Sequence, residues 1–356
     1  MSRPSYALID LDALVSNYKK IRALHGGKAF AVLKANAYGH GAVLCAKKLE
    51  PDADAFAVAF LEEALQLREA NIQKPILLME GVFDIKELRK AANHGFWIVI
   101  HQLKQLEMME QCASAMRGLN VWLKLETGMN RLGLDHTLAF EYKERLSAIR
   151  SVSKISFMTH LACADDQESD FSFKQVERFV NATSGLDCEL SVCNSAGVIN
   201  AMGRNFDWAR IGIAMYGVNP VRESLISLTP VMALRSEIFT VREVKKGGVV
   251  GYGSVNKVSR DTRIGIVAVG YADGYPRSAM GCRILVNGQL TKTLGAISMD
   301  MLAVDITELQ DVDVGAQVEL WGSGIQVSEV AQYSHMSPYE LLCNVKRVDC
   351  RHVHGM

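Results

Sequence analysis

The stretch AFAVLKANAYGHG, residues 29–41, decides the fold. It opens with a short apolar run, reaches a lysine at Lys34, and ends in a loop that contains Tyr38 and two glycines. A short apolar run bounded by turn residues is typical of a buried strand. We therefore predict a strand over residues 29–34, with Lys34 at its carboxyl end.

The same pattern returns seven more times along the chain. Between the apolar runs lie stretches whose apolar residues recur at three- and four-residue spacing, such as LEEALQLREA (residues 61–70) and FKQVERFVNA (residues 173–182). Strands that alternate with such helices indicate a parallel sheet built from βα units. The further runs cover residues 55–60, 75–81, 96–101, 121–126, 155–161, 189–194 and 209–217.

Eight strands are the number that closes a (β/α)8 TIM barrel, whereas an open doubly wound sheet rarely needs eight. After Pro230 the sequence pattern changes to β-rich runs separated by Gly, Asn and Asp turns. One short helical segment, residues 327–334, interrupts them. We predict an α/β barrel domain over residues 1–225 and a C-terminal, mostly β domain over residues 226–356. A helix over residues 11–24 precedes the first barrel strand, so the first residues are expected to pack with the β domain.

Composition and charge narrow the class of partner. The 356 residues include 39 Lys and Arg and 39 Asp and Glu, which leaves no basic excess to bind a nucleic acid or an anionic membrane. Asp10 and Asp12 interrupt the first apolar run, and no run approaches the ~20 residues that span a bilayer. We therefore expect a cytoplasmic protein that acts on a small molecule.

The eight cysteines lack the paired spacing of a zinc site. Reduced cysteine packs as a small apolar residue, so we expect free, buried thiols and no metal. The cysteines are Cys45, Cys112, Cys163, Cys188, Cys193, Cys282, Cys343 and Cys350.

Polar residues recur at the carboxyl ends of the predicted barrel strands, which in a TIM barrel face the active-site mouth. Taken singly, Lys34 could be a surface charge, His160 a core histidine and Arg210 a structural ion pair. Taken together they predict one site, because a serine with glycine backbone N–H groups can hold a phosphate and a lysine amine can bind an aldehyde cofactor covalently. The strand-end residues are Lys34, Glu126, His160, Asn194, Ser195, Arg210 and Gly212.

Four segments make the chain resemble the alanine racemase family of fold-type III pyridoxal-phosphate enzymes. They are AVLKANAYGHG (residues 31–41), LKLETGMNRLG (123–133), DWARIGIAMYG (207–217) and GYADGYPR (270–277), and the resemblance covers essentially the whole chain. It implies a barrel with a β domain and pyridoxal phosphate as cofactor. It also implies a head-to-tail homodimer in which each active site takes residues from the partner's β domain.

The resemblance assigns the cofactor residues one by one. Lys34 would hold pyridoxal phosphate, and Arg210 would face its pyridine nitrogen with His160 behind it. An arginine there stays protonated and cannot give the nitrogen a proton, which suppresses transamination. Around the phosphate the family pattern places Tyr38, Ser195, Gly212 and Ile213.

The resemblance also assigns the substrate residues. Arg131 and the backbone of Met299 would bind the substrate carboxylate, and Lys124 matches a position that is often carbamylated, where the added negative charge orients Arg131. Racemisation needs a base on each face of the cofactor, since one base tends to return the proton it took. By the family pattern Lys34 acts on the D-isomer and Tyr271, from the partner, on the L-isomer.

The sequence departs from the family pattern at three places. Glu126 stands where Asp or Asn is frequent, and Asn130 replaces a frequent glycine. No tyrosine directly precedes Arg347, where some members place one that contacts the phosphate.

Other functions compete with alanine racemisation. A broad-specificity racemase, for example for serine, would differ only in pocket-lining residues. A barrel-fold decarboxylase with the same cofactor usually carries a glycine-rich phosphate loop, and no G-G-G run occurs here. A non-catalytic pyridoxal-phosphate-binding regulatory protein lacks the β domain. The sequence leaves open whether the enzyme makes D-alanine or breaks it down.

Overall fold

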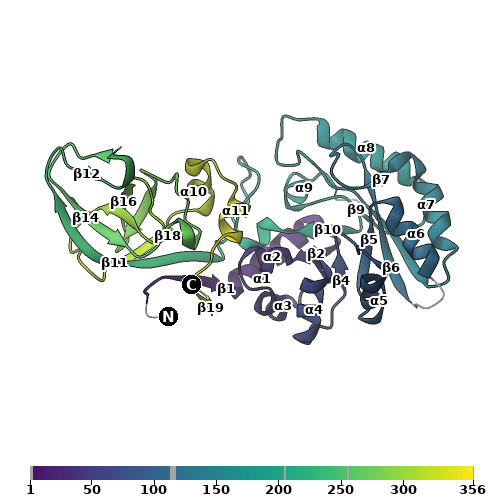
Figure 1. Ribbon diagram of the computed structural model, residues 1–356. Helices are drawn as coiled ribbons and strands as arrows, with labels where there is room; N and C mark the ends of the chain where they lie inside the picture. Colours follow the sequence, from purple (N-terminus) through teal and green to yellow (C-terminus); the bar gives the residue numbers. More distant parts are fainter. Residues whose placement is uncertain (1–2, 113–117, 204–205, 255, 356) are drawn as a thin grey trace.

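The computed structural model describes residues 3–112, 118–203, 206–254 and 256–355. Eight parallel strands form a closed ring, because β5 pairs with β6 as well as β4, and β2 pairs with both β3 and β10. This confirms the predicted barrel (Figure 1). The strands are β2 (Lys28–Val32), β3 (Ala55–Val58), β4 (Ile76–Leu78), β5 (Trp97–Ile100), β6 (Leu119–Glu126), β8 (Val152–Met158), β9 (Leu190–Ser191) and β10 (Trp208–Ile211).

Helices follow the strands around the outside of the ring. Their buried faces carry the apolar residues whose spacing predicted them, for example Leu61, Ala64 and Leu67 of α4. The short strand β7 (Leu134–Asp135) pairs with β6 outside the ring. The helices of this part are α1 (Leu11–His25), α2 (Lys34–Tyr38), α3 (Ala42–Leu49), α4 (Leu61–Glu69), α5 (Ile85–Asn93), α6 (Leu103–Cys112), α7 (Ala139–Ser147), α8 (Phe171–Thr183) and α9 (Ser195–Ile199).

Most of the predicted strands are shorter than their apolar runs. The strand predicted over residues 29–34 ends at Val32, so Lys34 lies two residues beyond β2 and begins α2 instead of ending the strand. In the run 189–194 only Leu190–Ser191 is strand, and in the run 209–217 the strand ends at Ile211. Gly212, with φ −110° and ψ −105°, then leads into the 3-10 turn η3 (Ile213–Tyr216), all of which is buried. Apolar character here reflects burial of a loop at the barrel mouth rather than continuation of the strand.

The second sheet forms the C-terminal β domain, to the left of the barrel in Figure 1. Strands β11, β14, β17, β16, β15 and β18 pair in a closed ring, and β1 with β19 extend it at β11. The N-terminal strand β1 therefore belongs to this sheet, antiparallel to β11 and parallel to β19. The strands are β1 (Tyr6–Asp10), β11 (Met232–Val244), β14 (Thr262–Val267), β15 (Arg283–Val286), β16 (Gln289–Leu294), β17 (Leu302–Asp305), β18 (Gln317–Trp321) and β19 (Asp349–Val353).

Smaller elements complete the β domain. The two-stranded pair β12 (Val249–Val250) and β13 (Asn256–Lys257) stands apart from the main sheet. Helix α10 (Val327–Ser334) coincides with the predicted helical piece. Helix α11 (Pro338–Cys343) lies where the β domain meets the barrel and contacts α2 (Figure 1).

Four aromatic rings fill the barrel near the amino ends of its strands. Phe30 stacks on Trp208 with ring centroids 4.4 Å apart, and Trp122 meets Phe30 edge-on at 5.4 Å. Trp97 packs against the same three rings, and Lys28 lies over Trp208. Because side chains fill this end of the barrel, any cavity lies at the opposite end, where the strands have their carboxyl ends.

The expectation that the cysteines are buried is wrong for two of them. Cys343 and Cys350 are exposed, because they lie on α11 and on the sheet-edge strand β19, whereas Cys45, Cys193 and Cys282 are buried. Cys163 and Cys188 are half-buried, and the side chain of Cys112 lies outside the described residues. Each of the seven described cysteines is free.

None of the described helices combines the length and the apolar character that crossing a bilayer takes.

Candidate active site

A cavity of about 410 Å3 opens at the carboxyl end of the barrel strands. It brings together nine residues that the sequence singled out, from α2 to η3, and leaves Tyr271 and Met299 outside its lining. The lining residues are Val32, Lys34, Ala35, Tyr38, Met79, Arg131, His160, Asn194, Ser195, Arg210, Gly212, Ile213, Tyr339 and Cys343.

Lys34 begins a turn of left-handed backbone. The four residues after it, 35–38, have φ between 51° and 54°, although none is glycine. Left-handed helical backbone costs roughly 1–2 kcal/mol per residue for such residues, so the surroundings must hold it. Strain of this kind collects at functional sites, and here it follows Lys34 directly.

Hydrogen bonds to side chains hold this turn. The backbone N–H of Ala35 donates to Glu63 at 2.6 Å, and the Asn36 side chain accepts from the N–H of Ala42 at 2.9 Å. His40 places its Nδ1 at 3.0 Å from the Ala37 carbonyl and 2.9 Å from that of Tyr38. Burial lowers the pKa of His40 to about 4, so the ring is neutral and Nδ1 carries the proton that it donates.

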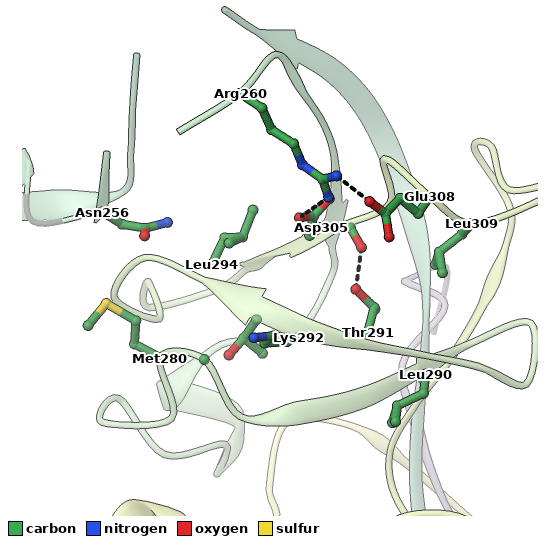
Figure 2. Close-up of a pocket in the computed structure, with 12 residues that line it drawn as sticks. Asn256, Arg260, Met280, Leu290, Thr291, Lys292, Leu294, Asp305, Glu308 and Leu309 are labelled. Atoms are coloured by element: carbon green, nitrogen blue, oxygen red, sulfur yellow. Dashed lines mark hydrogen bonds and ion pairs between the residues drawn. The ribbon is translucent and has the colours of Figure 1, made fainter. Parts of the chain in front are cut away.

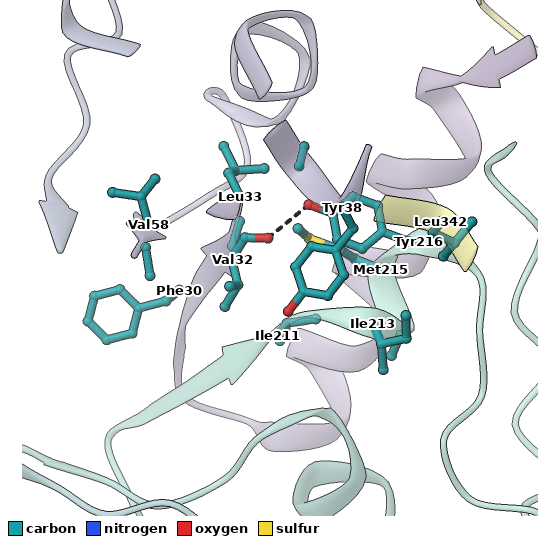
Figure 3. Close-up of a cluster of buried hydrophobic side chains, with 14 of the residues drawn as sticks. Phe30, Val32, Leu33, Tyr38, Val58, Ile211, Ile213, Met215, Tyr216 and Leu342 are labelled. Carbon is teal, nitrogen blue, oxygen red and sulfur yellow. Dashed lines mark hydrogen bonds between the residues drawn. The ribbon is translucent and has the colours of Figure 1, made fainter. Parts of the chain in front are cut away.

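A corner lined by hydroxyls lies beside Lys34. The Ser195 hydroxyl accepts from the backbone N–H of Gly212 at 3.0 Å. A Cβ at position 212 would lie 2.8 Å from the Tyr38 hydroxyl oxygen, so only glycine lets that hydroxyl approach the η3 loop. Tyr38 itself stacks on Tyr216, whose hydroxyl donates to the Val32 carbonyl at 2.8 Å (Figure 3).

The chemistry of this corner suits a phosphate group. Burial raises the pKa of Tyr38, so its hydroxyl stays protonated and donates a hydrogen bond. The two hydroxyls can donate to a phosphate monoester, and the backbone at the start of η3 lies beside them. The amine of Lys34 lines the same cavity. The residues present therefore fit an aldehyde cofactor that carries a phosphate.

Arg210 is buried at the back of the cavity. Its Nη1 donates to the Ser191 hydroxyl at 2.6 Å, and its Nη2 donates to the Thr159 carbonyl at 2.6 Å. Burial lowers the pKa of Arg210 to about 10, which still leaves the guanidinium charged at neutral pH. Arg210 therefore supplies a fixed positive charge.

His160 follows β8 and lies next to this charge, with its Nδ1 3.5 Å from the Nη2 of Arg210. Burial, and then the positive charge of Arg210, hold the pKa of His160 well below its usual value. Its ring is neutral, and Nδ1 is the acceptor nitrogen because it faces a guanidinium donor.

Lys124 lies in β6 and is buried beneath the mouth. Burial lowers the pKa of Lys124 to about 8; the carboxylate of Glu80 raises it, and the charges of Arg210 and Arg131 lower it further. Most of this amine is still charged at neutral pH, but the uncharged share is much larger than in an ordinary lysine. Asn130, next to Arg131, has φ 55°, a left-handed conformation that glycine and asparagine adopt more readily than other residues.

Tyr271 and Met299 lie on the surface of the β domain. Tyr271 is 36% exposed and Met299 is 53% exposed. The backbone N–H of Tyr271 donates to Ser298 at 3.0 Å, and that of Ala272 donates to Met299 at 3.0 Å, so the two residues belong to one hydrogen-bonded unit. The guanidinium of Arg277 lies 5.8 Å from the centre of the Tyr271 ring.

Comparisons with known proteins bear on this arrangement. The family model "Alanine racemase, N-terminal domain" matches residues 9–220, and "Alanine racemase, C-terminal domain" matches residues 231–352. The curated alanine racemase of Azoarcus sp. is 48% identical over 351 residues, which are 98% of this chain and 99% of that protein. The chain belongs to the alanine racemase family.

Solved structures of this family have the same fold. The biosynthetic alanine racemase of Pseudomonas aeruginosa superposes with a TM-score of 0.94 at 41% identity, over 99% of this chain and 100% of that one. The alanine racemase of Bartonella henselae, solved with covalently bound pyridoxal phosphate, superposes with a TM-score of 0.89 at 29% identity, over 98% of this chain and 99% of that one.

Sequence reasoning missed two lining residues of this family member, Tyr339 and Cys343. Both lie on α11 at a spacing of four residues, which places them on one face of a helix. The Tyr339 ring is 5.8 Å from the ring of Tyr38, and burial raises the pKa of Tyr339 to about 12. No tyrosine precedes Arg347, but Tyr339 lies at the cavity, and the helical spacing in YELLC was the available signal.

A second hollow, of about 510 Å3, lies in the β domain (Figure 2). Although it is larger than the Lys34 cavity, three of its four charged lining residues are already paired with one another. Arg260 faces Glu308 and lies 3.7 Å from Asp305. This hollow has no counterpart to the left-handed turn or to the hydroxyl corner among the residues that the structure describes, so the chemistry belongs to the Lys34 cavity.

Proposed function

We propose that this chain interconverts L-alanine and D-alanine with pyridoxal phosphate held on Lys34. The observation that carries the proposal is the meeting of the Lys34 amine, the hydroxyls of Tyr38 and Ser195, and the buried charge of Arg210 in one cavity at the barrel mouth. Membership of the alanine racemase family supports the same reaction.

The residues that would hold the cofactor divide into three groups. Lys34 would bind its aldehyde carbon, and Tyr38 and Ser195, with the backbone at Gly212 and Ile213, would hold its phosphate. Arg210, backed by His160, would face its pyridine nitrogen. When bound, pyridoxal phosphate supplies an electron-accepting ring that stabilises the negative charge left on the substrate when its α-proton departs.

The two bases would come from two copies of the chain. Lys34 would take the proton at Cα of D-alanine, and Tyr271 of the partner would take the proton at Cα of L-alanine. Support comes from the exposure of Tyr271 and Met299 on the β domain and from their position outside the chain's own cavity. We therefore propose a homodimer with shared active sites, in which Arg131 and the partner's Met299 backbone hold the substrate carboxylate.

The charge of Arg210 yields a testable expectation. Arginine keeps its protons and cannot give one to the pyridine nitrogen. Arg210→Glu puts in its place a carboxyl group, which can share a proton with that nitrogen. We expect slower racemisation together with a rise in pyruvate formed from alanine by side transamination. Both rates are measured on the same holoenzyme. A slower main reaction without additional pyruvate would refute the electronic role of Arg210.

Lys124 is proposed to carry a carbamate that orients Arg131. Only an uncharged amine attacks CO2, forming the N–C bond and releasing a proton, and the pKa of about 8 makes that form available. Intact-protein mass spectrometry under native conditions in bicarbonate should find the added mass of one CO2, increasing as the pH rises through 8. Lys124→Ala is the control. The unmodified mass at every pH would rule the carbamate out.

We also propose the domain limits 1–225 and 226–356, with the first residues packed on the β domain, as the pairing of β1 with β11 and β19 supports. The last barrel strand ends at Ile211 and β11 begins at Met232, which supports a boundary between them. The cytoplasm is proposed as the compartment because each of the seven described cysteines is free, as is usual where thiols stay reduced.

Substrate choice is tested with single enantiomers of several amino acids. The purified chain, loaded with pyridoxal phosphate, is incubated with L-alanine and with L-serine, and the products are separated by chiral chromatography. Alanine should have the highest kcat/KM. Equal or faster conversion of serine would favour a broad-specificity racemase, and release of CO2 would favour a decarboxylase.

A further inference from the structure

The carboxylate of Asp273 is the most heavily bonded charged group near Tyr271. Its side chain is 0% exposed, and it ends the 3-10 turn η5 (Tyr271–Asp273) that carries Tyr271. One oxygen accepts from the backbone N–H of Gly270 at 2.9 Å, which closes the turn on itself. A buried carboxylate needs more than one such partner to offset the loss of water.

Two arginines supply the remaining partners. Arg3 binds Asp273 in bidentate fashion, with Nη1 at 3.1 Å and Nη2 at 3.0 Å from the two oxygens. The Nε of Arg347 lies 3.6 Å from the same carboxylate. A planar guanidinium held at two points restricts direction as well as distance, so this pair fixes where the turn lies.

The fold delivers both arginines to this place. Strands β1 and β19 run parallel, with Tyr6 opposite Asp349, so the residues just before each strand lie side by side. Arg3 precedes β1, Arg347 precedes β19, and a side-chain nitrogen of Arg3 also donates to the Arg347 carbonyl. Arg347 adopts φ 58°, a left-handed conformation that an arginine holds only when its surroundings require it.

Arg347 also binds a second carboxylate, that of Asp300. Its Nη2 donates to Asp300 at 2.7 Å, and Asp300 is the residue after Met299. The loop of Met299 is already hydrogen-bonded to the turn of Tyr271 through Ala272. Arg3 therefore contacts the Tyr271 turn directly and the Met299 loop only by way of Arg347, whereas Arg347 joins the turn to that loop itself.

We propose that Arg3, Asp273 and Arg347 form a clamp that positions Tyr271 and Met299 as one rigid unit for the partner's active site. Arg3 and Arg347 are positioning residues. They act on the reaction by fixing the Tyr271 hydroxyl and the Met299 backbone. The inference rests on the proposed function, because it presumes that Tyr271 takes the proton of L-alanine.

The test compares Arg3→Met, Arg3→Lys and Arg347→Met with the wild-type holoenzyme. Methionine keeps an unbranched apolar side chain but removes the guanidinium. A misplaced proton acceptor slows chemistry, so Arg3→Met should lower kcat from L-alanine by on the order of 10- to 100-fold, with a much smaller change in KM. Arg347→Met should lower kcat and also raise KM, because the Met299 loop loses its tether. Arg3→Lys, which keeps the charge, should recover part of the loss.

Isotope effects separate positioning from general loosening of the fold. In Arg3→Met the α-deuterium effect on kcat/KM should rise with L-alanine, whose proton Tyr271 removes, and should not rise with D-alanine, whose proton Lys34 removes. Thermal unfolding and gel filtration record whether each variant is folded and dimeric. If Arg3→Met does not fold, the isotope effects with L-alanine and D-alanine are measured on Arg3→Lys and Arg347→Met instead.

The control is Arg283→Met, which removes a surface arginine of the same domain whose ion pair, among the residues that the structure describes, is with Glu329 at 3.2 Å. It should match the wild type. If the wild type racemises alanine and the clamp variants keep its kcat, KM and isotope effects, the clamp is refuted while the proposed function stands. If the wild type does not racemise alanine, the proposed function itself fails.

Discussion

Lys34→Ala should abolish racemisation of alanine, lowering kcat/KM by at least about 10⁴-fold, the upper end of what one general base contributes. The loss is this large because Lys34 would serve both as the covalent link to the cofactor and as one of the two bases. Its place after β2, at the start of the left-handed turn, aims the amine into the cavity. Rates are measured in both directions on protein saturated with pyridoxal phosphate.

The matched control is Lys47→Ala. Lys47 is exposed on α3, which follows the same turn, so its removal changes a nearby positive charge without touching the cavity. It should keep wild-type activity. Borohydride reduction of the wild-type holoenzyme, followed by peptide mapping, should place the pyridoxyl group on Lys34. A label on any other lysine, or a Lys34→Ala chain that keeps a tenth of the activity, would overturn the assignment.

Two inactive chains should restore each other's activity when they are mixed. Lys34→Ala removes one proposed base and Tyr271→Phe removes the other. A mixed dimer then has one site with both bases and one site with neither. With free subunit exchange about half of the dimers are mixed, so activity should approach about a quarter of the wild-type value.

Complementation also tests which chain provides Tyr271. Tyr271→Phe keeps the ring of the turn and removes only the hydroxyl, so a loss of activity reports on chemistry rather than on folding. Mass spectrometry of the mixture verifies that mixed dimers are present. If they form and activity does not return, both bases come from one chain.

Much of the barrel could be predicted from periodicity alone. Each apolar run in residues 29–217 corresponds to a barrel strand, because a strand covered by helices on one side and by the barrel core on the other has no polar face to display. The residues at which the strands end were less predictable than the strands themselves. Residues 213–217 are as apolar as a strand, yet they form a buried 3-10 turn after Gly212.

Part of the cavity could also be predicted from the order of the barrel strands. Strand ends in a barrel meet at one mouth, so Lys34, His160 and Arg210 could be placed together before their distances were known. The left-handed backbone of residues 35–38 was not predictable, since it contains no glycine and depends on His40 and Glu63 for support.

Contacts across the whole chain could not be predicted from local pattern. Arg3 and Asp273 are 270 positions apart, and only the pairing of β1 with β19 brings Arg3 beside Arg347. Tyr339 reaches the cavity because α11 packs on α2, a contact between the last and the first parts of the chain. Such contacts depend on tertiary arrangement rather than on residue spacing.

The central claim is two-base racemisation of alanine, and one measurement addresses it directly. The holoenzyme is incubated with L-alanine in D2O, and both enantiomers are separated and analysed for deuterium at Cα over time. We expect D-alanine to form with solvent deuterium at Cα from the first turnovers, and the two enantiomers to reach equal amounts. Deuterium entering L-alanine without formation of D-alanine would contradict the account, because it would mean that a single base returns the proton to the face from which it came.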